Sequence, residues 1–412
     1  MSIHLEEFNM QQVSNHTMTS NQKWTMASTT IGQGLESMDM SFLSFTLTSI
    51  IASLHISSGA AGMLSTITTL GSLLGGIFFG IIADKFGRVK VLTYTIFIFA
   101  FATAGIYFTS NIFMLYILRF LVGVGAGGEY GAGMTLIAEN FDKSKLGRAI
   151  SITTIGGQVG SIMAALLAAV MIPVVGWRSI YLVGLVPVIF AFIVRRNVKE
   201  SDDFIKTMET DKADRPKVSI AKLFKTPKLT MQTMALMLMV VVQIAGYYGL
   251  INWLPSIMQK KLGLSVSGSS EWMIVTIIGM SVGMMVFGTI LDKFGPRISF
   301  GIFLLTAAVA VFGITFAFNG LTLLLASTVL GFFSNGMYGG YGVIVSLLYP
   351  TEIRSTANNF IVSVGKAIGG FSPAVIGLLM ESHSLLFIMS LLSIAYVISF
   401  CTMLSIPALK NI

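Results

Sequence analysis

Cysteine and histidine are almost missing from this 412-residue chain. Cys401 is the only cysteine, so no disulfide framework can form. The four histidines lie in tails or loops, at His4, His16, His55 and His383. They form no cluster with carboxylates at metal-ligand spacing, and we therefore expect no metal, no cofactor and no enzyme activity. Charged residues make up only 11% of the chain, which excludes an ordinary soluble domain.

Hydrophobic residues dominate instead, at 54% of the chain with a mean hydropathy of +0.82. The apolar runs lie at 26–53, 60–82, 89–109, 113–137, 149–172, 178–195, 230–254, 271–291, 298–318, 321–348, 356–380 and 385–406. A helix needs roughly 20 residues to cross a bilayer. The 42 glycines suit close helix packing in lipid. We predict an all-α membrane protein with twelve transmembrane helices.

One short motif occurs twice, at positions separated by half the chain length. The first copy reads Gly80-Ile-Ile-Ala-Asp84-Lys85-Phe86-Gly87-Arg88, and the second reads Gly288-Thr-Ile-Leu-Asp292-Lys293-Phe294-Gly295. They are 208 residues apart (288 − 80), and each is a charged turn between two apolar runs. Such a duplication indicates a protein built from two repeats, here two bundles of six helices.

Lysine and arginine are concentrated in one set of loops. They crowd the stretch between the two halves, whereas the opposite side has only Arg178, Lys260 and Lys261. Cytoplasmic loops carry the excess of these residues, so we expect both termini in the cytoplasm. The predicted parts are a tail (1–22), an N-terminal bundle (23–195), a cytoplasmic linker (196–228), a C-terminal bundle (229–407) and a tail (408–412). The net charge of +8 is then a topology signal, and no nucleic-acid partner is expected.

Together with the duplicated turn, two further motifs carry a family resemblance. One is Arg119-x-x-x-Gly123-x-Gly125-x-Gly127-Gly128-Glu129-Tyr130, and the other is Tyr349-Pro350-Thr351-Glu352-Ile353-Arg354-Ser355-Thr356. With these motifs the chain resembles the major facilitator superfamily over nearly its whole length after residue 24. The resemblance implies two six-helix bundles around a central cavity that opens alternately to either side of the membrane.

A narrower resemblance points to bacterial symporters of organic acids. Glu36-Ser37-Met38-Asp39 resembles the paired acids of the nicotinate permease, the sialic acid permease and the aromatic-acid:proton symporters. Tyr247-Tyr248-Gly249-x-x-x-Trp253-Leu254-Pro255 is similar to the nicotinate permease. Two residues depart from these families: Glu36 stands where Asp is usual, and Lys366 where many relatives have Arg. The resemblance implies a monomer in the bacterial inner membrane.

Five ionisable side chains fall inside the apolar runs, namely Glu36, Asp39, Arg119, Glu129 and Lys366. A charge in a bilayer costs a few kcal/mol, so each should face a partner or a wet cavity. At about 1.5 Å rise per residue, Asp39 and Arg119 lie at nearly the same depth, which predicts an ion pair within about 4 Å. The alternative for all five is a buried ion pair that only fixes helix packing.

Proton coupling is assigned to four of these residues. By resemblance Asp39 is the leading proton carrier, with Arg119 as its partner and with Glu36 and Glu129 as further candidates. A carboxylate at this depth is held ionised by a cation or protonated by desolvation, and small movements tip the balance. Glu129 has small neighbours at helical spacing, so a packing role is the alternative for it.

Substrate binding is assigned to a polar stripe and to scattered neutral groups. Asn359, Ser363 and Lys366 recur at i, i+4 and i+7, and a lysine facing a cavity attracts an anion. The alternative for Lys366 is a salt bridge to an acid of another helix. The further candidates supply hydrogen bonds and ring stacking: Gln158, Gln243, Tyr247, Asn252, Asn335 and Tyr338. For the aromatic ones, packing or lipid contact is the commoner fate.

A cytoplasmic gate is the predicted role of the residues at the ends of helices on the basic side. They are Gly80, Asp84, Gly87, Arg88, Glu139, Arg148, Asp292, Glu352 and Arg354. Ion pairs among them would hold one arrangement and break in alternating access. The alternative, loop solvation and topology, explains the bases but not the repeated acids.

These observations predict a proton-coupled importer of a small organic anion, such as nicotinate, sialate or an aromatic acid. Its partners would be the anion, the proton and the lipid bilayer. A proton-antiporting exporter of drugs or metabolites and a sugar:proton symporter are the alternatives within transport. A non-transporting membrane sensor is disfavoured, because the chain carries no signalling domain.

Overall fold

The computed structural model describes residues 18–141, 143–200, 205, 220–349 and 351–410. All the regular elements in this part are helical. The first group comprises α2 (Ser20–Leu54), α3 (Ser58–Phe86), α4 (Arg88–Gly105), α5 (Ile112–Asn140), α6 (Lys143–Val175) and α7 (Val186–Asn197). The second comprises α9 (Pro227–Leu262), α10 (Val266–Phe316), α11 (Gly320–Gly336), α12 (Gly340–Leu348), α13 (Thr351–Gly369), α14 (Ser372–Ser382) and α15 (Leu385–Leu404). Short 3₁₀ segments are η1 (Ile106–Phe108), η2 (Ser179–Leu185), η4 (Ile220–Phe224) and η5 (Pro407–Lys410).

Ten helices of the described part are long and apolar enough to cross a membrane. Many large apolar side chains point outward from them, for example Phe113, Val174 and Met285, each at least 73% exposed. Such a surface is costly in water and suits hydrocarbon. The protein is therefore a multi-pass membrane protein.

The duplicated sequence motif forms the same backbone turn in both halves. Gly87 (φ 109°) separates α3 from α4, and Gly295 (φ 76°) breaks α10 into two arms. Residues with a side chain rarely adopt such positive φ values, so glycine is required at both places. The sequence repeat is therefore a structural repeat: helix, sharp charged turn, helix.

Serine, threonine and asparagine fix where several helices begin. The side chains of Ser57, Asn111, Ser265 and Ser384 accept hydrogen bonds from the first-turn amides of α3, α5, α10 and α15. Thr19 forms a capping box that starts α2 at Ser20, earlier than the apolar run that begins at residue 26. The first turn of α2 is polar, so the apolar run alone does not indicate where this helix begins.

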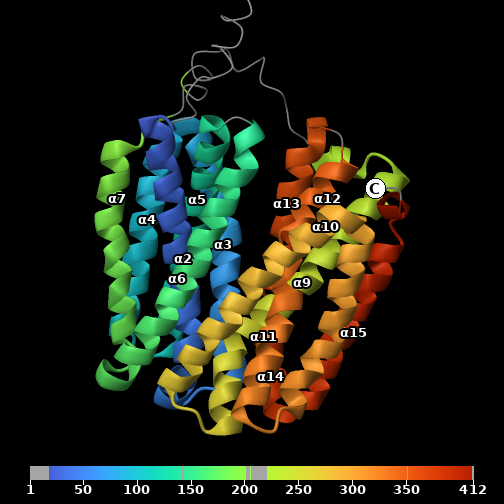
Figure 1. The fold of residues 1–412 in the computed structure, drawn as a ribbon. Coiled ribbons are helices and arrows are strands. Elements are labelled where there is room, and N and C mark those ends of the chain that lie inside the picture. The colour runs from blue at the N-terminus through green and yellow to red at the C-terminus, as the bar shows by residue number, and fades with distance from the viewer. Residues whose placement is uncertain (1–17, 142, 201–204, 206–219, 350, 411–412) are drawn as a thin grey trace, which may run out of the picture.

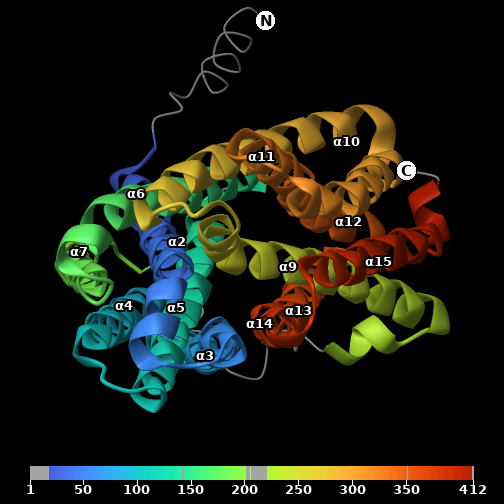
Figure 2. The same ribbon diagram turned by 90° about the horizontal axis from the view of Figure 1, so that it is seen from below.

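The two groups of helices lie side by side, α2–α7 in one and α9–α15 in the other (Figures 1 and 2). They pack together mainly through α3 against α14, α6 against α10 and α2 against α9. Figure 1 shows that α2 begins and α7 ends on its upper side, where the C-terminal end also lies. We call this side the upper face and the opposite side the lower face.

Four hydrogen bonds between described residues join the two groups. Three connect side chains to the partner group's backbone: Thr66 to the Gly370 carbonyl (3.0 Å), Ser267 to the Ala169 carbonyl (2.6 Å), and the Gly59 amide to Glu381 (2.6 Å). The fourth links the hydroxyls of Thr48 and Ser256 (2.8 Å). Most of these residues lie near the turns of the lower face, where α14 and the ends of α2 and α6 are found (Figure 1). The groups are thus closed at the lower face.

Glycine allows the closest helix contacts in the first group. On α5, a Cβ at Gly127 would collide with the backbone of Ser72 on α3, whereas a Cβ at Gly131, one turn later, would meet open space. Without a hydrophobic force between helices in lipid, such close contact is a main source of association.

We therefore expect Gly127→Ala to lower stability by about 1–3 kcal/mol, because the added methyl forces α3 and α5 apart. The matched control Gly131→Ala should keep or slightly raise stability, since alanine favours a helix. Thermal unfolding of the purified variants in detergent measures both. Equal melting temperatures for the two would show that this contact contributes nothing.

Candidate functional site

A cavity of about 180 Å³, measured as the space open to water centres, lies between the two groups. Both groups line it, and its wall combines apolar side chains, such as Met40, Ile244 and Ile251, with many polar ones. From the first group come Gln33, Glu36, Ser37, Ser41, Ser44, Ser65, Thr69, Tyr130, Thr153, Thr154, Gln158 and Ser161. From the second come Tyr247, Tyr248, Asn252, Asn335, Tyr338 and Lys366. One water needs ~10–15 Å³ of such space, so the cavity has room for a small organic molecule.

Lys366 brings the only lysine ammonium to this wall, from the last turn of α13. Its Nζ lies 4.8 Å from the centre of the Tyr130 ring on α5, a distance at which a cation is attracted to the face of an aromatic ring. Among the described residues no carboxylate is within salt-bridge distance of this ammonium. The positive charge therefore faces the cavity without a protein anion attached to it.

Tyrosine rings surround the ammonium from three further positions. Tyr247 and Tyr248 on α9 hold their ring centres 5.5 Å apart at a tilt of 43°, and Tyr338 follows α11. All line the cavity, together with Asn252, whose amide donates to the Tyr248 carbonyl (2.8 Å). Flat rings beside a cation offer a place for a flat, anionic molecule.

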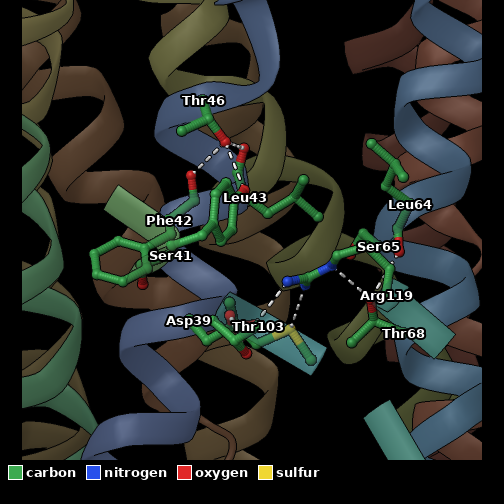
Figure 3. Close-up of polar contacts among 12 residues, drawn as sticks. Asp39, Ser41, Phe42, Leu43, Thr46, Leu64, Ser65, Thr68, Thr103 and Arg119 are labelled. Carbon is green, nitrogen blue, oxygen red and sulfur yellow. Dashed lines mark hydrogen bonds and ion pairs between the residues drawn. The ribbon is translucent and has the colours of Figure 1, made fainter. Parts of the chain in front are cut away.

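Asp39 and Arg119 form a buried ion pair between α2 and α5, as the depth argument predicts. The Arg119 guanidinium donates to Asp39 Oδ2 at 2.7 Å. Thr103 on α4 donates to the other oxygen of Asp39 (3.0 Å), and Arg119 Nε donates to Thr68 on α3 (3.0 Å). Figure 3 shows the guanidinium between Asp39 and Thr68. Both side chains are buried, and neither lines the cavity.

Glu36 lies on the wall of the cavity, and Glu129 lies in a small recess beside it. Glu36 lines the cavity and accepts a hydrogen bond from Gln33 (3.2 Å). Glu129 is only 7% exposed, and one of its carboxylate oxygens lies against Gly32, one turn before Glu36 on α2. Both glutamates border a small recess that shares Gln33, Tyr130 and Thr153 with the cavity wall. The small residues around Glu129 thus make room for its carboxylate beside α2.

Three of the expected binding residues are placed differently from the rest. Gln243 is fully buried, donates to the Ser334 carbonyl (3.3 Å) and does not line the cavity. Ser363 is exposed and is also absent from the wall, so the expected stripe on α13 does not face the cavity as a whole. The side chain of Asn359 lies outside the described part of the structure. The other expected binding residues all line the cavity: Gln158, Tyr247, Asn252, Asn335, Tyr338 and Lys366.

One polar face of α2 was overlooked in the sequence. Gln33, Ser37 and Ser41 recur every four residues, and all three line the cavity. With Glu36 and Ser44 they form a continuous helical face, so the spacing alone held the signal. Tyr130 and Tyr248 belong to the sequence motifs but were not among the expected binding residues. Both line the cavity.

The expected gate residues make one ion pair in the described part of the structure. Arg88 and Glu139 lie 3.0 Å apart, and Arg88 also donates to the Ala83 carbonyl (3.3 Å). Both belong to the first group, so this pair does not join the two groups. Gly87 forms the turn itself, Gly80 has open space around it, and Asp292 is exposed. The side chains of Asp84, Arg148, Glu352 and Arg354 lie outside the described residues.

Glu200, which follows α7, caps the beginning of α4 at the turn formed by Gly87. Its two carboxylate oxygens accept hydrogen bonds from the amides of Arg88 and Val89, each at 2.9 Å. These are the first amides of α4, which otherwise has no side-chain cap. No sequence pattern indicates this contact, because the two segments are more than 100 positions apart.

Comparison with known proteins agrees with this architecture. The sequence profile of the Major Facilitator Superfamily matches residues 29–282 and 236–410. A putative metabolite transport protein of Haemophilus influenzae is 37% identical over 92% of this chain and 95% of its own length. The cis,cis-muconate transport protein of Acinetobacter baylyi is 30% identical (85% and 86%), and the niacin transporter NiaP of the same organism is 25% identical (89% and 91%). The crystal structure of a D-xylose–proton symporter superimposes with a TM-score of 0.78 at 19% identity, covering 92% and 96% of the two chains.

The Asp39–Arg119 pair predicts a specific pattern of stability. Arg119→Met should destabilise the protein by about 3–5 kcal/mol, because it leaves the Asp39 carboxylate buried without a cation. Adding Asp39→Leu to that variant should restore part of the loss, since no unpaired charge then remains. Unfolding in detergent, measured as a double-mutant cycle, gives the coupling. Additive losses would mean that the two charges do not depend on each other.

Proposed function

Because the chain belongs to the Major Facilitator Superfamily, we propose that it imports a small organic anion together with a proton by alternating access. The anion is a monocarboxylate of the size and shape of nicotinate or an aromatic acid. The observation that carries the proposal is Lys366, a cavity-facing ammonium with no carboxylate attached to it among the described residues and with tyrosine rings around it. The relative named for niacin supports the same class of substrate, and the relative named for muconate, a dicarboxylate, supports organic anions more broadly.

The proposed topology has twelve crossings. In the first half, α2 to α6 make five and η2 with α7 makes the sixth. In the second, α9, the two arms of α10, α11 with α12, α13 with α14, and α15 make six. The basic loops and both termini then belong on the upper face, in the cytoplasm of a bacterial cell with the inner membrane as its location. A cavity closed at the lower face is in this orientation an inward-facing state.

In the proposed cycle Asp39 exchanges its arginine partner for a proton. Asp39 is paired with Arg119 in this inward-facing state, and in the proposed cycle this paired form is the one without the proton. When the cavity opens outward, separation of the pair would leave a carboxylate that binds a proton from the outside. The proton and the anion then move inward together, and the gradient of protons drives accumulation.

An importer and an exporter differ in the direction of flux. In proteoliposomes with an acidic exterior, we expect labelled nicotinate to accumulate inside, and collapse of the pH gradient to release it. Accumulation driven only by an acidic interior would instead establish the antiporting exporter.

Removing the ammonium tests the anion site. We expect Lys366→Ala to weaken nicotinate binding by ~1.5–3 kcal/mol, roughly 10- to 100-fold, because a charge-assisted contact is lost. Binding of nicotinamide, which has the same ring without the charge, should change little. Lys366→Arg should retain part of the affinity, although a planar fork changes the contact geometry.

Titration calorimetry with the acid and the amide measures this difference. Lys293→Ala, which removes an exposed lysine outside the cavity, is the matched control. Equal losses for acid and amide in Lys366→Ala would assign the lysine to structure rather than to the substrate.

Neutralising the proton carrier should separate coupling from exchange. In Asp39→Asn we expect acid-driven accumulation to vanish while counterflow exchange of nicotinate continues, because exchange does not require release of the proton. Glu271→Gln, an exposed acid at the start of α10, provides the control. Intact pH-driven accumulation in Asp39→Asn would remove Asp39 from this role.

A further inference from the structure

The recess beside the cavity contains two acids, and no cation of the described residues is bound to either. Glu36 and Glu129 both line it, and the other walls are Thr29, Gln33, Leu92, Tyr130, Gly133, Met134 and Thr153. The recess adjoins the cavity through Gln33, Glu36, Tyr130, Met134 and Thr153, which line both spaces. Glu36 therefore faces both spaces, and Glu129 lies in the recess that adjoins the cavity.

Glu129 lacks a partner for its charge in the described part of the structure. It is more than nine-tenths buried, and neither a hydrogen bond nor an ion pair of its carboxylate is found among these residues. A backbone surface, that of Gly32, lies directly against one of its oxygens. Burial of an isolated carboxylate is costly, so a binding event that removes its charge is favoured here.

The surroundings of the pair contain a single free cation among the described residues. The charges that act on Glu36 are those of Lys366 across the cavity and Asp39 on its own helix, and Glu36 in turn acts on Glu129. In the part of the chain that the structure describes, Gln33 is the only side chain that donates to Glu36. Arg119 lies on the helix of Glu129 but is bound to Asp39, and the hydroxyls of Tyr130, Tyr248 and Tyr338 stand around Lys366. If both glutamates were ionised, Lys366 could neutralise only one of them, and one negative charge would have no counter-ion.

We infer that Glu36 and Glu129 together form a proton-binding site of the inward-facing cavity, which holds one shared proton when the cavity is empty and takes up a second when an organic anion occupies Lys366. The proton adds to a carboxylate oxygen as an O–H bond, and it returns to water when the anion leaves. This inference rests on the proposed function, which places the anion at Lys366.

The physical link is the charge of Lys366. In the empty cavity this charge stabilises one ionised glutamate, whereas two like charges in one recess disfavour ionisation of both. An anion bound to Lys366 cancels its charge, so the remaining carboxylate is left without a counter-ion and binds a proton. By linkage, a proton on the pair must equally strengthen binding of the anion.

The pair completes the path of the proton. Asp39 is sealed from the cavity in this state and engaged with Arg119 and Thr103. Glu36 lies three residues before it on α2, hence on the same helical face and on the cavity side. The same proton then binds two sites in succession. It binds Asp39 in the outward-facing state, and it binds the glutamate pair before it leaves to the cytoplasm.

Infrared spectroscopy of the ligand-free protein tests the shared proton. We expect the stretching band of a protonated carboxyl group at neutral pH in the wild type and in the control Glu271→Gln. Glu129→Gln should lose the band, because Glu36 alone beside Lys366 stays ionised, and the double variant Glu36→Gln/Glu129→Gln should lose it too. A band that persists in both variants would overturn the shared proton.

Titration calorimetry with nicotinate, in two buffers of different ionisation enthalpy, tests the link to the anion. We expect uptake of about one proton per bound anion in the wild type, in Glu271→Gln and in Glu129→Gln, where Glu36 still faces Lys366. The double variant should take up almost none. Full uptake in the double variant would overturn the inference, whereas absence of nicotinate binding in the wild type would overturn the proposed substrate and leave the infrared result to decide the pair.

Discussion

Hydrocarbon offers no partner to a polar group, and this constraint organises the interior of the protein. Each charge within the spanning helices has to be met by another side chain or by the cavity. Arg119 is met by Asp39, Thr68 and the sulfur of Met40. Thr103 of α4 donates to Asp39, so four helices of the first group share one buried contact. Lys366 and Glu36 face the cavity instead, and Glu129 faces the recess beside it. The same constraint therefore produces both the rigid centre of one half and the chemistry of the space between the halves.

Small residues determine where that constraint can be satisfied. Glycines on α5 let α3 approach, and this approach brings Thr68 to the Arg119 guanidinium. On α2, Gly32 leaves room for the carboxylate of Glu129, and Gly34 packs against Gly160 of α6. A side chain at the glycines of α5 or at Gly160 would push two helices apart, and one at Gly32 would displace the carboxylate of Glu129. Packing and electrostatics are thus inseparable in the first half.

Much of this architecture was predictable because membrane-spanning helices leave strong signals in a sequence. Long apolar runs, a repeated Asp-Lys-Phe-Gly turn and two further motifs were enough to predict an all-helical membrane protein of this family, which the sequence profile confirms. The Asp39–Arg119 contact followed from depth alone. The number of crossings and the side of the termini remain predictions, because they depend on where the bilayer lies.

The details of the cavity were less predictable, since they depend on how helices rotate about their axes. Gln243 was expected on the wall and lies behind it, because polar residue type does not tell which side of α9 faces inward. Ser363 and Lys366, three residues apart, proved to face different surroundings. Glu200 could not be found at all, because its partners are the amides of a distant turn, and backbone amides have no sequence signature. The polar face of α2, by contrast, was predictable from the spacing of Gln33, Ser37 and Ser41.

One lysine opposite two glutamates has a consequence for the membrane voltage. With one proton shared by the glutamates, the fixed charges of the empty cavity sum to zero, and an anion bound with a second proton leaves the sum at zero. Moving one elementary charge through the membrane costs about 2.3 kcal/mol per 100 mV. A cavity that is neutral both empty and loaded avoids this cost in both directions of the cycle. The membrane potential would then neither drive nor retard the carrier, and the proton concentrations alone would set how far the anion accumulates.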